Sequence, residues 1–285
     1  MKQSLLNLLF SLIAFLLGYV IALLTGLELI QHAVLIAFMI QWVAFVPAYF
    51  FQTEKFYDLT GSVTYIFTVS YVSIKSYSLD NINIGSVILA LSIILWAIRL
   101  GSFLFMRIHK SGEDRRFKFI KPSPTRFFMT WTLQGMWVSL CSMCALTAIA
   151  SKNGVVQNGF LYLGIFVFII GLMIEMIADI QKSNFRKNLE NKDQFIHHGL
   201  WSYSRHPNYF GEITLWFGIS IMSLSSLSSW QYITLISPIF TYFLLVYVSG
   251  VRILEISGME KWGHLDSYKE YIRTTPSLFP FSKLF

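Results

Sequence analysis

Residues 158–178 read NGFLYLGIFVFIIGLMIEMIA. The run carries a single ionisable side chain, Glu175, and its apolar residues occur on every side of a helix. About 20 apolar residues are enough to cross a bilayer as a helix, and the run is longer than the strand of a membrane barrel. A helix also satisfies all of its own backbone hydrogen bonds in lipid. The stretch therefore predicts a membrane-spanning helix.

Similar runs fill most of the chain. Only 13% of its 285 residues are charged and 55% are hydrophobic, whereas about a quarter of a soluble protein is charged. The other candidate spans are 4–24, 29–51, 62–78, 84–106, 127–150, 213–227 and 230–250. The third and seventh of the eight runs, 62–78 and 213–227, are short or polar. The predicted fold is thus an all-α, polytopic helical membrane bundle of seven to eight transmembrane helices.

Positive charge is confined to a few connections. Residues 107–126 read RIHKSGEDRRFKFIKPSPTR and hold seven Lys or Arg, and 182–205 and the tail after 251 are also basic. The connections 79–83 and 151–157 hold one Lys between them. The positive-inside rule then places both termini and the main loops in the cytoplasm. We expect an integral protein of the bacterial inner membrane, whose first run is retained and not cleaved as a signal peptide.

The run 158–178 leads into an ionisable helix face. Glu175 and Asp179 lie one turn apart, and Lys182 and Arg186 follow on the same face. Spacings of three and four residues bring helical side chains together. The pattern fits either a set of ion pairs or the wall of a cofactor site, and it does not decide between them.

The segment GEDRRF, 112–117, places Arg115 and Arg116 next to each other, with Lys118 and Lys121 nearby. Guanidinium groups match the geometry of phosphate oxygens and are always charged. This segment is suited to a pyrophosphate or a ribose phosphate, and equally to lipid headgroups.

A dense polar stretch, GLWSYSRHPNYFGEI, occupies 199–213. Pro207 removes His206 from helical geometry and favours a helix that starts at Pro207 itself. Asn208 and Glu212 would then face one site, and Arg205 and His206 would lie at the helix N-terminus, which attracts anions. Tyr209 adds an aromatic ring with a polar end. We interpret the stretch as a site for phosphate and amide groups at the membrane surface.

The tail supplies a third polar element. VSGVRILE, 248–255, puts Arg252 and Glu255 on one face at the cytoplasmic end of the last span. SYKEYIRTTPSLFPF, 267–281, follows, and an amphipathic segment that folds back under the bundle would close a cofactor pocket at the cytoplasmic face. Cys141 and Cys144 form a CxxC inside the fifth run, where we interpret them as small packing residues, and we predict no metal site.

These motifs together resemble the steroid 5α-reductase family. The likeness lies in GLWSYSRHPNYFGE, the upstream AD-x-Q helix and the downstream SGVRxLE tail, and it is greatest to a bacterial branch of unknown function. WAIRLGSFLFMRI and GEDRRF also resemble that branch. The resemblance divides the chain into N-terminal transmembrane helices, 1–54, and a steroid-reductase-like membrane domain, 55–285.

The resemblance implies a membrane reductase that uses NADPH and acts on CH–CH groups. Hydride would pass to a carbon–carbon double bond of a lipophilic enone, steroid-like or isoprenoid-like, and the expected partners are that substrate and membrane lipid, with no nucleic acid. Carried over by position, the cofactor set is Asp179, Arg186, Asn208, Glu212 and Arg252. The other cofactor-binding candidates are Arg205, His206 and Tyr209 beside this set, Arg115 and Arg116, which suit the phosphates, and Glu255 in the tail. Glu212 would lie near the nicotinamide as a catalytic residue.

The substrate half matches the family less well. A glutamate and a tyrosine hold the ketone in the steroid enzymes, whereas Asp58 stands near the glutamate position and Trp96 near the tyrosine position. Asp58 and Tyr65 are therefore our candidates for the catalytic acid. An alternative class is open, because isoprenylcysteine methyltransferases carry a similar RHPxYxG and use S-adenosylmethionine. A lipid-binding protein without enzymatic activity is a third interpretation.

Overall fold

The computed structural model describes residues 2–79 and 83–280, which form helices and connecting turns with no strand among them. This confirms the all-α prediction. The chain divides into two compact units, residues 1–162 with 220–237, and residues 163–219 with 238–285. We describe each unit by itself. The boundary at residue 54, drawn from the family resemblance, stays a prediction.

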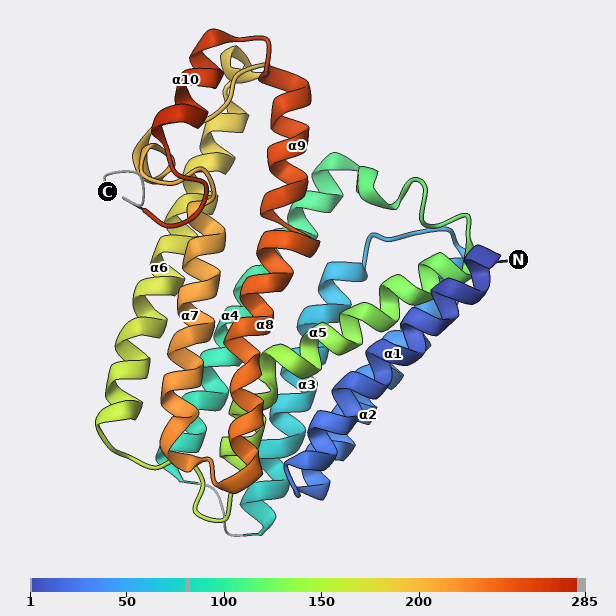
Figure 1. Ribbon diagram of the computed structural model, residues 1–285, viewed down its shortest axis with the longest axis vertical. Helices are drawn as coiled ribbons and strands as arrows, with labels where there is room; N and C mark the ends of the chain where they lie inside the picture. Colours follow the sequence, from blue (N-terminus) through green and yellow to red (C-terminus); the bar gives the residue numbers. More distant parts are fainter. Residues whose placement is uncertain (1, 80–82, 281–285) are drawn as a thin grey trace. The chain divides into compact units, whose positions relative to one another are not determined.

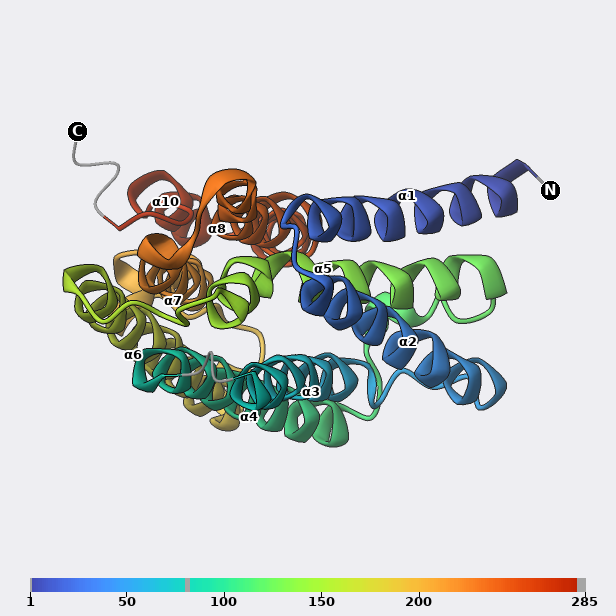
Figure 2. The same cartoon turned by 90° about the horizontal axis from the view of Figure 1, so that it is seen from below.

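The first unit is built around one helix. Its helices are α1 (Lys2–Leu24), α2 (Glu28–Phe50), α3 (Tyr57–Ser78), α4 (Ile84–Ser111) and α5 (Pro124–Ala150), with short helices η1 (Arg115–Phe117), η4 (Leu224–Ser226) and η5 (Ser229–Leu235). Helix α5 contacts the other four and is buried along most of its length. Figure 2 shows α3 and α4 side by side, and α1 along α5. Cys141 and Cys144 are buried in α5 as free thiols.

Polar side chains join these helices across their apolar faces. Gln41 donates to Thr64 Oγ1 at 2.8 Å, and Trp42 donates to Thr132 Oγ1 at 3.0 Å. Bonds of this kind specify which helix faces pair, because lipid gives apolar faces no preference for one another.

The second unit contains α6 (Gly159–Lys187) from Leu163 onward, α7 (Pro207–Ser223) up to Ile219, α8 (Ile236–Phe243) from Pro238, α9 (Val251–Trp262) and α10 (Asp266–Thr274). Short helices η2 (Leu189–Asn191) and η3 (Gly199–Ser202) lie in the connection from α6 to α7. Figure 1 shows α10 turning back from the end of α9 toward this connection. Helix α7 begins at Pro207, as predicted.

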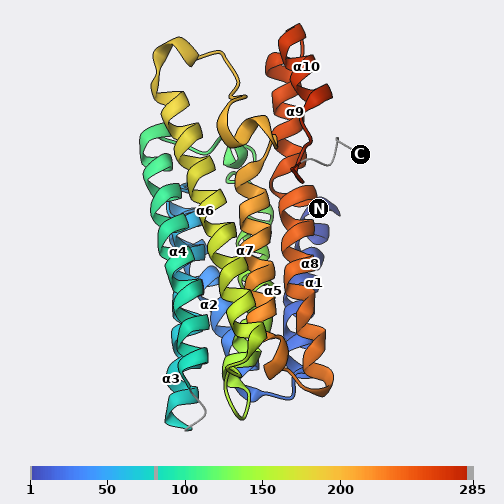
Figure 3. The same cartoon turned by 90° about the vertical axis from the view of Figure 1, so that its left-hand side faces the viewer.

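Glycines allow α6 and α7 to pack backbone to backbone. A Cβ added to Gly211 would lie 2.5 Å from the backbone nitrogen of Glu175 and 2.7 Å from the oxygen of Gly171. Two turns farther along α7, a Cβ on Gly218 would lie 2.8 Å from the oxygen of Gly164. Figure 3 shows the two helices running side by side. Small residues at such a seam let membrane helices approach closely.

The passage from α8 to α9 is irregular. A π-helical turn, Leu244–Val248, precedes Gly250, and Ser249 donates its backbone N–H to the oxygen of Leu244 at 2.9 Å. A Cβ on Gly250 would lie 3.1 Å from the ring of Tyr209. The break therefore lets the chain pass close to the start of α7, and π-turns of this kind are frequent near functional sites.

Six helices among the described residues are long and apolar enough to cross a membrane: Lys2–Leu24, Glu28–Phe50, Ile84–Lys110, Pro124–Ala150, Gly159–Lys187 and Ser229–Trp262. The protein is an integral membrane protein by this measure. The two remaining predicted runs also form helices, α3 and α7, but these do not reach the same length and composition. They are the runs whose sequences are short or polar. The predicted orientation of the loops stays a prediction.

The close contact between α6 and α7 predicts that stability is sensitive to a side chain added at Gly211. Gly211→Ala should lower the free energy of unfolding by about 2 kcal/mol, because the added methyl group meets backbone atoms of α6 that cannot rotate away. Denaturant unfolding in detergent measures the change. Gly159→Ala, on the same helix pair but with nothing within 4 Å of the added group, is the matched control and should unfold as the wild type does. Equal stability of the two variants would contradict the close packing.

Candidate cofactor site

The connection between α6 and α7 is fixed to the side of α6. The carboxamide of Gln181 accepts from the backbone N–H of Leu200 at 3.0 Å, and Trp201 Nε1 donates to the oxygen of Ala178 at 3.2 Å. Gly199 has a φ of 64°, and a Cβ there would lie 2.5 Å from the Gln181 side chain. Glycine is needed here for both backbone conformation and space. The polar stretch is therefore held in one place before α7 begins.

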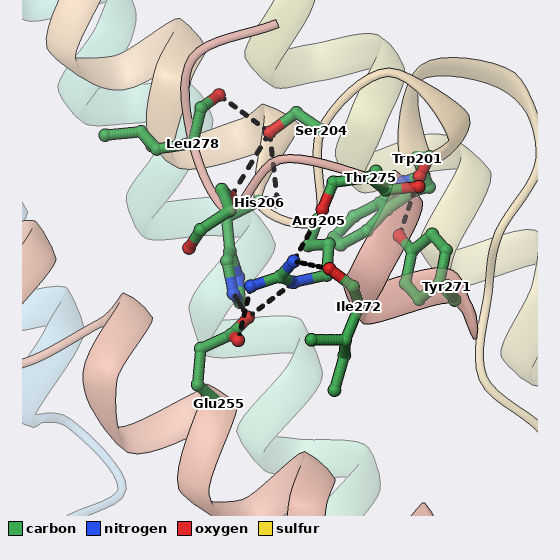
Figure 4. A network of polar contacts seen from close by, with 10 residues as sticks. Trp201, Ser204, Arg205, His206, Glu255, Tyr271, Ile272, Thr275 and Leu278 are labelled. Atoms are coloured by element: carbon green, nitrogen blue, oxygen red, sulfur yellow. Dashed lines mark hydrogen bonds and ion pairs between the residues drawn. The ribbon is translucent and has the colours of Figure 1, made fainter. Parts of the chain in front are cut away.

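The carboxylate of Glu255 on α9 is bound by two consecutive residues of this stretch (Figure 4). Arg205 donates Nε to Oε1 at 3.1 Å and Nη2 to Oε2 at 2.7 Å. His206 Nε2 lies 2.6 Å from Oε1. A two-pronged guanidinium contact fixes both distance and orientation. The segment that leads into α7 is thereby joined to α9 through one acidic group.

Arg205 also binds the tail. Its Nη1 donates to the oxygens of Ile272 at 3.0 Å and Thr275 at 2.5 Å, and its backbone N–H donates to the oxygen of Pro276 at 2.9 Å. These oxygens lie at the C-terminal end of α10, where helix carbonyls have no partner within the helix. Arg205 is thus committed to protein groups, and its direct contact with a cofactor stays a prediction.

Two more contacts hold the tail to the polar stretch. Ser204 Oγ donates to the oxygen of Leu278 at 2.8 Å, and the hydroxyl of Tyr271 donates to the oxygen of Trp201 at 2.6 Å. The tail folds back onto the stretch, as the sequence predicted for an amphipathic closing segment.

The acidic face of α6 reaches the same region. Asp179 is 6% exposed, and Asn208 Nδ2 donates to its Oδ1 at 3.3 Å. Lys182, one turn on, places its ammonium 4.6 Å from the centre of the Trp201 ring. Asp179 and Asn208, assigned together from the family resemblance, are therefore neighbours.

A cavity of about 480 Å³ lies among α6, the α6–α7 connection, α9 and α10. Its basic lining residues are Lys182, Arg186, Lys192, Arg205 and Lys261, and its one carboxylate is Glu255. Glu255 is bound by Arg205 and His206, so the cavity has an excess of positive charge. Such a cavity suits an anionic ligand.

Aromatic rings form another wall of the cavity. Phe195 packs edge-on against Tyr268 at 4.8 Å between centroids, and Trp262 lies 5.7 Å from Tyr268. Trp262 Nε1 donates to the oxygen of Asp193 at 2.7 Å, which ties the connection to α9. Flat rings beside cations match the base and phosphates of a nucleotide. The residues present therefore fit a phosphorylated nucleotide.

The sequence identified part of this lining. Of the predicted cofactor residues, Arg186, Arg205, His206 and Glu255 line the cavity, and Tyr209 stacks on His206 at 6.0 Å. Arg252 is exposed, and neither it nor Glu212 lines the cavity. Sequence reasoning did not assign Lys192, Lys261 or the aromatic wall. The signals in the sequence were Lys182, one turn before Arg186, the basic segments that contain Lys192 and Lys261, and Tyr268 in the tail.

The remaining predicted residues belong to the first unit. Arg116 is paired with Asp114 at 2.5 Å, and the buried Glu54 binds Lys121 and the backbone N–H of Asp114. Burial opposes ionisation of Asp114, but the hydrogen bonds and charge of Arg116 hold its pKa below the usual value. The GEDRRF segment thus contains an ion pair of its own, between Asp114 and Arg116. The side chain of Arg115 lies outside the described part.

Asp58 and Tyr65 both lie on α3. Asp58 is 4.0 Å from Arg107, and burial raises its pKa above the usual value. Tyr65 is buried and meets Trp96 edge-on at 5.2 Å. The hydroxyl of Tyr57, at the start of the same helix, donates to the oxygen of Thr130 at 3.0 Å. The catalytic roles of Asp58, Tyr65 and Glu212 stay predictions.

Comparison with known proteins places the chain in a broader context. The family described as "Protein of unknown function (DUF1295)" matches residues 44–275. A probable O-methyltransferase, UstE of Ustilaginoidea virens, is 34% identical over 101 residues, which cover 30% of this chain and 35% of that protein. The chain thus matches about a third of that relative's length. No solved structure matches the chain significantly.

The contacts of Arg205 predict a strong effect of a conservative change. Arg205→Lys should lower the free energy of unfolding by about 3 kcal/mol, because one ammonium cannot bind Glu255 and the two tail carbonyls together. Hydrogen exchange of residues 263–278 should accelerate as the tail loosens.

The matched control is Arg273→Lys. Arg273 is a surface arginine whose side chain is 75% exposed and pairs with Glu270, three residues before it. Stability and tail exchange should not change in this variant. Equal exchange in both variants would contradict the role of Arg205 in holding the tail.

Proposed function

This chain belongs to the DUF1295 family, and we propose that it is a membrane reductase that uses NADPH to reduce a carbon–carbon double bond of a lipophilic enone. The observation that carries the proposal is the cavity, in which five cations face an aromatic wall. NADPH has three phosphate groups and an adenine ring, and it supplies a hydride when bound. The likeness of GLWSYSRHPNYFGE and the SGVRxLE tail to steroid 5α-reductases gives the reaction class.

The residues of the cavity have separate parts in this proposal. Arg186 and Lys182, on α6, together with Lys192 and Lys261, bind phosphate oxygens. The aromatic wall excludes water from the base. Arg205 and Glu255 position the tail and the start of α7, and they are not themselves phosphate ligands. Asn208 at the start of α7 donates to Asp179 and is not among the residues that line the cavity; a contact of its amide with the nicotinamide is a further part of the proposal.

Reduction of an enone also requires a proton. Asp58 is our candidate donor, because burial raises its pKa and so favours the protonated carboxyl group. In a reduction of this kind, a protonated acid stabilises the enolate charge that develops on the carbonyl oxygen.

The second candidate is an O-methyltransferase that uses S-adenosylmethionine. The similarity to the probable O-methyltransferase UstE favours it, as does the RHPxYxG pattern of 205–211. S-adenosylmethionine carries no phosphate, so this candidate makes less use of the positive charge that lines the cavity. We favour the reductase for that reason.

A competitive titration separates the two candidates. The full chain in mild detergent is titrated with NADPH and with S-adenosylmethionine, each in the presence of 2′,5′-ADP or S-adenosylhomocysteine. We expect binding of NADPH that 2′,5′-ADP displaces, followed by NADPH oxidation with a hydrophobic enone. Binding of S-adenosylmethionine alone would refute the reductase in favour of the methyltransferase.

A pair of adjacent substitutions tests the phosphate contact. Arg186→Gln should weaken NADPH binding roughly tenfold or more, as expected for a lost charge-assisted hydrogen bond. Lys187→Gln removes the same charge one residue on, from a side chain that does not line the cavity and donates to Asn184 Oδ1 at 3.3 Å. It should leave the affinity within about twofold of the wild type. Equal losses in both variants would show only a general effect of charge.

A further inference from the structure

One nitrogen of the His206 ring has a hydrogen-bond partner, and the other has none among the described residues. The side chain is 7% exposed, and Nε2 lies 2.6 Å from Glu255 Oε1. An ionised carboxylate only accepts hydrogen bonds, so Nε2 carries the proton. In the neutral ring, Nδ1 is then an acceptor with a free lone pair.

Nδ1 is fully buried and has no hydrogen-bond partner among the described residues. A buried acceptor without a partner is costly, and an exception of this kind in a folded protein calls for a reason. His206 lines the cavity, and its ring is stacked on Tyr209. The cavity that His206 lines offers a place for a ligand that supplies the missing donor.

We propose that His206 Nδ1 accepts a hydrogen bond from a nucleoside bound in the cavity, from a ribose hydroxyl or the adenine amino group. Glu255 is the positioning residue, because it holds the proton on Nε2 and keeps Nδ1 as the acceptor. The identity of the ligand rests on the proposed function, whereas the assignment of the ring proton to Nε2 does not. Both candidate cofactors contain an adenosine group, so the acceptor serves either.

The proposal makes binding depend on pH. The charged and titratable groups that face His206 or share its cavity are Glu255 from α9, Lys182 from α6, the adjacent Arg205, Tyr209 from α7, and Tyr268 and Tyr271 from α10. Burial lowers the pKa of His206 below its usual value, and it outweighs the opposite effect of Glu255. Protonation turns Nδ1 from acceptor into donor. Affinity is therefore complete above a pH of about 6.5, the ordinary histidine pKa, and falls once the pH drops through the lower pKa of His206.

Two substitutions separate a ligand contact from a purely structural role. The amide oxygen of His206→Asn can take the place of Nδ1, and it does not titrate. The longer side chain of His206→Gln can reach the place of Nε2 and bind Glu255, but it leaves no acceptor near Nδ1. We expect NADPH affinity within about threefold of the wild type and independent of pH in the Asn variant, and a loss of roughly tenfold in the Gln variant. A larger loss of affinity in the Asn variant than in the Gln variant would overturn the proposal. That result is expected if the only role of His206 is to hold Glu255.

Nitrogen-15 spectra of the histidine rings test the same proposal without relying on affinity. The wild type at pH 7.5 should show His206, assigned by its absence in His206→Asn, as the Nε2–H form, and NADPH should shift the Nδ1 signal. A proton on Nδ1 in the free protein overturns the proposal whatever binds. An Nδ1 signal that is unmoved by bound NADPH overturns it while leaving the reductase intact. If NADPH does not bind, the proposed reductase fails, and S-adenosylmethionine must produce the shift or the proposal fails with it.

Discussion

The carboxylate of Glu255 is the group on which the arrangement of the second unit depends. It accepts from Arg205 and from His206, and Arg205 in turn holds the last carbonyls of α10. Three segments far apart in the sequence, the polar stretch at 199–213, α9 and the tail, meet through these few bonds. The side chain of Glu255 is 26% exposed, and those of Arg205 and His206 are 10% and 7% exposed. A carboxylate with so little access to water requires such partners. These bonds hold together the connection, α9 and α10, which form three of the walls of the cavity.

The glycine seam between α6 and α7 supplies the rigid base for that network. Backbones in contact at Gly171 and Gly211 fix the register of the two helices. Asp179 and Asn208 therefore meet across the seam, and Lys182 and Arg186 project from α6 into the cavity. Cations on a helix are held more precisely than cations on a loop, which is what recognition of a phosphate requires. Lys192 and Lys261 come from the connection and from α9, and complete the charge on the other sides.

The sequence predicted the fold class and many helix positions because apolar run length is a local property. Pro207 likewise predicted the start of α7 from its own geometry. The pairing of charges was not predictable in the same way. Arg205 appears in the sequence as an anion ligand, but its guanidinium binds Glu255 and the tail, which lie 50 residues or more away. Arg116 is neutralised by Asp114, two residues before it, because η1 turns the side chains together. The aromatic wall could not be foreseen, since Phe195, Trp262 and Tyr268 become neighbours only when α9 and α10 fold against the connection.

The central claim is that a phosphorylated nucleotide binds in the cavity of the second unit. Hydrogen exchange on the full chain in lipid nanodiscs, with and without saturating NADPH, tests this most directly. NADPH should slow exchange in residues 182–206 and 254–271, which contain the cavity lining, and should leave α1 unchanged. Slowed exchange elsewhere with none in these two segments, at NADPH concentrations that saturate binding, would contradict the claim.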